Sequence, residues 1–111
     1  MLEKLITTVF EARDAAHRAH WATNSYAQHE TLGEFYTEVI DTLDKYVEAC
    51  QGACGVKTSD QSDSAKMLKD NLVWITENRS KLAKDIPALE NILDELVGVY
   101  LKALYKLENL R

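Results

Sequence analysis

Residues 2–50 read LEKLITTVFEARDAAHRAHWATNSYAQHETLGEFYTEVIDTLDKYVEAC, and the spacing of their apolar side chains decides the fold class. Apolar residues recur every three or four positions, which is the period of an amphipathic helix rather than of a strand. One face of residues 2–22 carries Leu2, Leu5, Ile6, Val9, Ala12 and Ala16, and one face of residues 28–50 carries Leu32, Tyr36, Val39, Leu43, Val47 and Cys50. The connection between the two stretches is short, so we expect two antiparallel helices.

The same period continues through the C-terminal half of the chain. A third helix is expected to begin near the N-cap types Ser62 to Ser64, and a fourth near Pro87, a residue that suits a first helical turn. Glycine and proline are scarce, four and one in 111 residues, so few positions interrupt these helices. The sequence therefore predicts an all-α protein, a single ferritin-like four-helix bundle over residues 1–111 with helices at about 2–22, 28–50, 63–82 and 86–110.

Residues 51–61, between the second and third predicted helices, include two glycines and have a polar composition. Fully extended at about 3.3 to 3.6 Å per residue, these eleven residues are just long enough to cross a bundle lengthwise. A ferritin-type crossover and a plain up-down connection both remain open at this point.

Composition and charge narrow the function classes. The net charge is −5 and neither end carries a basic arm, which argues against a nucleic-acid partner. No run of eighteen apolar residues exists, so we expect no membrane partner, and the first residues lack the layout of a secretion signal. We therefore expect a cytoplasmic protein, in the host cytoplasm if its source is viral. Cys50 and Cys54 have no second cysteine cluster and are interpreted as reduced thiols near a helix end.

All three histidines of the chain, His17, His20 and His29, lie within thirteen positions. At 100° per residue, His20 falls at the centre of the apolar arc of the first helix, His17 lies on its shoulder, and His29 shares the direction of Val47 on the second. A single inward histidine is usually a core imidazole bonded to a carbonyl. Three on consecutive helices make a metal site an equal alternative, and both interpretations stay open.

An acidic stripe follows the histidines. Residues 29–48 contain six carboxylates and only one lysine, Lys45. The carboxylates are Glu30, Glu34, Glu38, Asp41, Asp44 and Glu48. Most of them are predicted to form a solvated helix face. Asp44 and Glu48 differ because they lie four residues apart on the border of the apolar arc, where a second interface can enclose them.

These residues together resemble a known family. The "AHW" pattern with His20 and Trp21, then His29 at the start of the next helix, then Asp44 and Glu48, resembles the Dps-like mini-ferritins of the ferritin-like superfamily. The resemblance implies a di-iron ferroxidase site between two subunits. It assigns His20 and His29 of one chain as nitrogen ligands, and Asp44 and Glu48 of the partner chain as oxygen ligands.

The sequence departs from that family in ways that limit what is carried over. The family has an acidic ligand one turn after its second histidine, where this chain has Gly33, and it often has a basic tail that is missing here. DNA protection is therefore not expected. The small size also suits the uncharacterised ferritin-like proteins of phage genomes.

The predicted function follows from the ligand types. Imidazole and carboxylate ligands suit iron, manganese or zinc, and open positions on iron permit oxidation of Fe(II) to Fe(III). His17 is an additional candidate ligand, and a site shared between chains requires a homo-oligomer, at least a dimer through the first two helices. The alternative is a metal-free oligomerisation or protein-interaction module, in which the interface anchors are Trp21, Tyr26, Tyr36, Tyr46 and Trp74.

Overall fold

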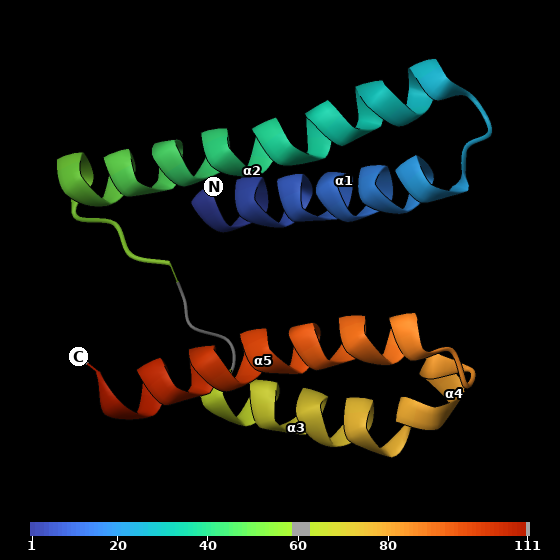
Figure 1. Cartoon of the computed structure of the whole chain (residues 1–111). Helices are drawn as coiled ribbons and strands as arrows, with labels where there is room; N and C mark the ends of the chain where they lie inside the picture. The colour runs from blue at the N-terminus through green and yellow to red at the C-terminus, as the bar shows by residue number, and fades with distance from the viewer. Residues whose placement is uncertain (59–62, 111) are drawn as a thin grey trace. The chain divides into compact units, whose positions relative to one another are not determined.

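The computed structural model describes residues 1–58 and 63–110, and most of these residues are helical (Figure 1). In these ranges the helices are α1 (Leu2–Ala22), α2 (Tyr26–Cys54), α3 (Ser64–Glu77), α4 (Arg79–Ala83) and α5 (Pro87–Asn109). The prediction of an all-α protein is confirmed. None of these helices is both long and apolar enough to cross a membrane within the described part of the chain.

The chain divides into two compact units, one formed by α1 and α2 and the other by α3, α4 and α5. In the first unit α1 and α2 pack side by side as an antiparallel hairpin, drawn in blue and green in Figure 1. Ala16 and Leu43 are its buried core residues. In the second unit α5 packs against α3 and α4, with Ile75, Ala83 and Leu104 buried. The further prediction of one ferritin-like four-helix bundle stays a prediction.

The turn between α1 and α2 is three residues long, shorter than the five residues, 23–27, that separate the two predicted helices. Ser25 is the N-cap of α2, and its hydroxyl accepts a hydrogen bond from the backbone N–H of Gln28 at 3.3 Å. This cap satisfies one of the free donors of the first turn, so the helix begins at Tyr26 rather than at about residue 28.

The C-terminal end of α2 lies four residues beyond the predicted one. Gly55 ends the helix in the left-handed conformation, with φ of 68°, and its N–H donates to the carbonyl of Gln51. Glycine adopts positive φ without steric penalty, which makes it the usual residue at this position. The apolar period stops near Cys50, but the helix continues to this glycine because helical hydrogen bonding does not require an apolar face.

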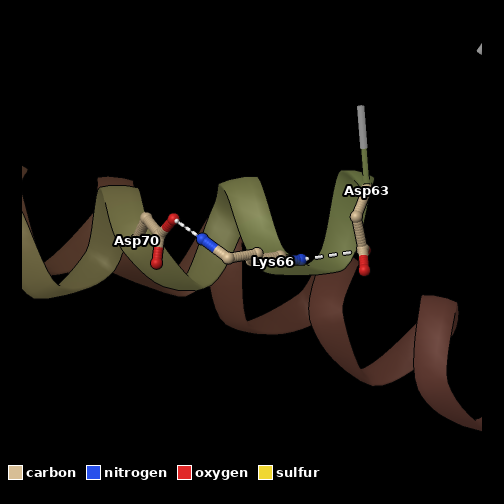
Figure 2. Close-up of polar contacts among 3 residues, drawn as sticks. All are labelled: Asp63, Lys66 and Asp70. Carbon is tan, nitrogen blue, oxygen red and sulfur yellow. Dashed lines mark hydrogen bonds and ion pairs between the residues drawn. The ribbon is translucent and has the colours of Figure 1, made fainter. Parts of the chain in front are cut away.

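Helix α3 begins one residue after Asp63, whose carboxylate accepts from the N–H of Lys66 at 3.1 Å (Figure 2). The side chain of Lys66 reaches forward and forms an ion pair with Asp70 at 2.7 Å, also drawn in Figure 2. Ser62, named above as a candidate cap, lies outside the described residues. Asp63 is thus the N-cap residue of α3.

The third predicted helix, about 63–82, is interrupted. α3 ends at Glu77, and the short α4 starts at Arg79. Asn78 lies between them, and its side-chain amide donates to the carbonyl of Trp74 at 2.8 Å. Side chains of this type compete for helix carbonyls and so favour helix ends. Two further ion pairs, Lys69–Glu108 and Arg79–Asp94, each 2.8 Å long, connect α3 and α4 to α5.

Each unit, taken by itself, leaves large apolar side chains exposed to solvent. In the first unit they include Phe10, Trp21, Tyr26, Phe35 and Tyr46, and in the second Trp74, Ile92, Leu96, Val99 and Tyr105. Scattered single apolar residues are normal on protein surfaces. The number of large exposed apolar side chains in each of these small units nevertheless predicts that other protein surfaces cover them.

Candidate functional site

The two histidines nearest the α1–α2 turn form a stacked pair. The imidazole of His20 lies parallel to that of His29, with ring centroids 3.6 Å apart and an angle of 17° between the planes. The Nδ1 atom of His20 is 2.6 Å from the backbone carbonyl oxygen of His29, and the Nδ1 atom of His29 is 2.8 Å from the carbonyl oxygen of His20. The pair is therefore held by two reciprocal bonds between α1 and α2.

These two bonds place a proton on the Nδ1 atom of each ring. A carbonyl oxygen only accepts hydrogen bonds, so each Nδ1 must carry its proton and donate it. A neutral ring with Nδ1 protonated has a free lone pair on Nε2. No hydrogen bond to either Nε2 atom is present in the part of the chain that the structure describes. In their neutral forms the two rings therefore present two nitrogen lone pairs from neighbouring helices.

The local sequence explains why the pair forms. The carbonyl of His20 is among the last four of α1, which have no partner within the helix, and the imidazole of His29 supplies one. Gly33 leaves room for the ring of His20. A Cβ atom at that position would lie 3.1 Å from its Cε1 atom and 3.3 Å from its Nδ1 atom.

An open groove of about 370 Å³ lies beside the pair. It is lined by both histidines and, from α2, by Glu30, Gly33, Glu34, Thr37 and Glu38. The three glutamates are exposed, so their long side chains are free to rotate in the groove. The groove brings flexible carboxylates to the same face as two imidazoles, which is the ligand chemistry of transition-metal sites.

His17 has a different environment from the other two histidines. Its ring stacks on Tyr36 with centroids 3.8 Å apart, and it contacts Trp21 at 4.3 Å. Burial lowers the pKa of His17 below 6.5, the nearby charges of Arg13 and His20 lower it further, and Asp14 acts weakly in the opposite direction. The structure places His17 in an aromatic stack next to the pair, 6.4 Å from His20 between centroids.

The predicted carboxylate ligands lie elsewhere on the same chain. Asp44 and Glu48 are exposed on α2, fifteen and nineteen residues beyond His29. At 1.5 Å per residue they are about 22 and 28 Å along the helix from it. Within the described residues, no three His, Cys, Asp or Glu side chains come together to hold a metal ion. Because Asp44 and Glu48 were assigned to a second chain, that site stays a prediction.

Two features of the site were missed by sequence reasoning. Glu30, Glu34 and Glu38 are exposed, as expected of a solvated face, but the sequence did not predict that they line one groove with His20 and His29. The role of Gly33 was also missed, since it was regarded only as a missing ligand. A glycine four residues after His29 was the available signal, because positions four apart share a helix face and a missing side chain there leaves room for a facing ring.

Comparison with known proteins places the sequence. Residues 20–107 match the family described as "Family of unknown function (DUF5856)". The chain is also 29% identical over 96 residues, 82% of its length and 75% of the relative's, to "Uncharacterized 14.6 kDa protein in mobD-ri intergenic region" of Enterobacteria phage T4. No solved structure matches the chain.

The phage relative confirms the predicted likeness to an uncharacterised phage protein, whereas neither comparison indicates a ferritin-like protein. The matched range contains His20, His29, Asp44 and Glu48, and it begins after His17. Because this range covers most of the sequence, the chain belongs to the family of unknown function DUF5856.

Proposed function

We propose that the protein binds a divalent transition-metal ion through the Nε2 atoms of His20 and His29. The observation that carries this proposal is the pair of reciprocal bonds that hold both Nδ1 atoms on backbone carbonyls. Metal-binding histidines commonly donate their other ring nitrogen to a carbonyl or carboxylate, which fixes the tautomer and aims the ring. Here both rings have that support before any metal binds.

The remaining ligands in this proposal come from a second copy of the chain. One chain offers two nitrogen donors, and its Asp44 and Glu48 lie more than 20 Å along α2 from them. A twofold axis that pairs two α2 helices in opposite directions brings the carboxylates of one chain to the histidines of the other. The homo-oligomer, at least a dimer, is therefore part of the proposal.

Iron, manganese and zinc all suit such a mixed imidazole and carboxylate site, and iron is our first choice. With Fe(II) as substrate, the reaction is its oxidation to Fe(III), with dioxygen or peroxide accepting the electrons. The residues of the chain would hold and orient the ion. The ferritin-like four-helix bundle and a cytoplasmic location, in the host if the source is viral, belong to the same proposal and rest on the sequence resemblance.

Metal content tests the proposal directly. The full chain, purified without chelators or a nickel column, is expected to retain or take up iron, manganese or zinc stoichiometrically, as measured by elemental analysis. His20→Ala and Asp44→Ala should each abolish uptake while circular dichroism shows the helices intact. Asp41→Ala is the matched control because Asp41 lies on the same helix and belongs to the predicted solvated stripe. Metal uptake that survives both site variants contradicts the proposal.

The second candidate is a metal-free interaction module. The same reciprocal bonds favour it, because they already satisfy both Nδ1 atoms and tie α1 to α2 without an ion. The exposed side chains of Trp21 and Tyr26 would then anchor a partner surface. Under this function the protein contains no metal, and His20→Ala changes only its stability or its association. Elemental analysis together with sedimentation distinguishes the two functions.

A further inference from the structure

The C-terminal end of α2 carries two free thiols that the proposed function does not use. Cys50 is half-buried and Cys54, the last residue of the helix, is exposed. They are four residues apart, so they lie on the same side of the helix, one turn from each other. Tyr46 lies one turn before Cys50, and interaction with the Cys50 side chain raises the pKa of its hydroxyl.

The spacing of the two thiols favours a shared metal ion over a disulfide. Residues four apart on a helix have Cβ atoms about 5–6 Å apart. A disulfide requires a Cβ separation of about 3.5–4.5 Å, so the intact last turn of α2 does not allow one. A metal ion with bonds of about 2.3 Å to sulfur spans two sulfur atoms up to about 4.6 Å apart. Rotation about the Cα–Cβ bonds can bring two cysteine sulfurs four residues apart on a helix within that separation.

The side chains around Cys50 are mostly apolar. Cys50 lines a cavity of about 280 Å³ together with Met1, Leu5, Tyr46 and the apolar side chains of Leu2 and Val56. One of these lining residues, Met1, has a thioether sulfur but is fully exposed. Thiolate and thioether ligands select soft ions such as Cu(I) over the harder ions suited to imidazole and carboxylate.

We propose that Cys50 and Cys54 form a Cu(I) site at the end of α2, separate from the histidine pair. Binding replaces the two thiol protons by one monovalent ion: two thiols and Cu(I) give a dithiolate complex and release two protons. The oxidation state of copper does not change in this step. The inference is independent of the proposed function of His20 and His29.

Anaerobic titration with Cu(I) tests this site on the reduced full chain. The competitor is a chromophoric Cu(I) chelator, and we expect one equivalent of copper to be withdrawn from it per chain. Cys50→Ser and Cys54→Ser should each lower the affinity at least tenfold, because each leaves a single thiolate. Ala53→Ser, a change on the same turn, and His20→Ala should leave the titration unchanged.

Three outcomes overturn the inference. If each single cysteine variant keeps half the capacity of the native chain, the thiols act separately. If sedimentation shows that copper joins two chains, the ion bridges molecules rather than the turn of one helix. If mild air oxidation converts the pair into a disulfide within one chain, seen by mass spectrometry as the loss of two hydrogens, the spacing argument is wrong. Circular dichroism of each variant identifies any that fails to fold.

Discussion

Gly33 shows how one missing side chain shapes the candidate site. In an exposed helix interior, alanine is favoured over glycine by up to about 1 kcal/mol. At Gly98 in α5 an added Cβ meets nothing within 4 Å, so Gly98→Ala should increase the free energy of unfolding by about that amount. At Gly33 the same methyl group would lie 3.1 Å from the His20 ring.

We therefore expect Gly33→Ala to increase the free energy of unfolding much less than Gly98→Ala does, or not at all. The His20 ring must move to make room for the methyl group, which weakens its hydrogen bond to the His29 carbonyl. Urea unfolding of the two variants measures the difference. NMR of the imidazole nitrogens should show both rings protonated at Nδ1 in the native chain and a disturbed His20 in Gly33→Ala. Equal stabilisation by both substitutions would show that the ring does not depend on this space.

His17 gives the protein a predictable pH dependence. Its pKa is lowered by burial in the aromatic stack and by the charges of Arg13 and His20. The unfolded chain therefore binds a proton at His17 at a higher pH than the folded chain does. As the pH falls below about 6.5 towards the folded pKa, the free energy of unfolding decreases, and above about 6.5 this contribution vanishes.

Urea unfolding between about pH 5 and pH 8 tests this sign. The native chain should lose stability on the acid side of this range, and His17→Gln, which cannot be protonated, should lose less. The same slope in both proteins would assign the pH dependence to other groups.

At the scale of one element, the start of α3 has two kinds of polar contact whose contributions to stability can be compared. Asp63 accepts from a backbone N–H of the first turn, while Asp70 pairs with the exposed side chain of the same residue, Lys66 (Figure 2). Removing a capping side chain typically costs about 1 kcal/mol, whereas exposed ion pairs are screened by water and salt. Asp63→Ala should destabilise the protein clearly more than Asp70→Ala does.

Thermal unfolding at low and high salt checks this order. The small effect of Asp70→Ala should disappear at high salt, and that of Asp63→Ala should persist because a cap is a short-range hydrogen bond. A larger effect for Asp70→Ala would mean that the ion pair rather than the cap holds the start of α3.

The elements also show what the sequence predicts and what it does not. The apolar period identifies the helices because burial of one face depends on it, and the bounds of α1 agree with the expected 2–22. The end of α2 depends on Gly55, and the break at Asn78 depends on a side-chain bond to Trp74, so the period does not indicate either. Inward histidines were expected, but their reciprocal bonds depend on how α1 and α2 align in space.

For the whole molecule, the exposed apolar residues of both units make association the central expectation. In the first unit Trp21 is 71% exposed and Tyr26 77%, and tryptophan and tyrosine are enriched at protein interfaces. Sedimentation of the full chain should show at least a dimer. The substitution Trp21→Ser should weaken it, and a matched change at an exposed polar position, Thr31→Ser, should not. If the protein is a monomer at high concentration, no second chain can supply Asp44 and Glu48 to the histidines, which contradicts the shared metal site.

The shared site is tested most directly by mixing two inactive variants. His20→Ala retains the carboxylates and Asp44→Ala retains the histidines, so a mixed dimer contains one intact site out of two. Random pairing after joint refolding makes half of the dimers mixed, and the mixture should bind about a quarter of the metal that the native protein binds, although each variant alone binds none. If the mixture also binds none, or if either variant alone binds metal, the site is not shared between two chains.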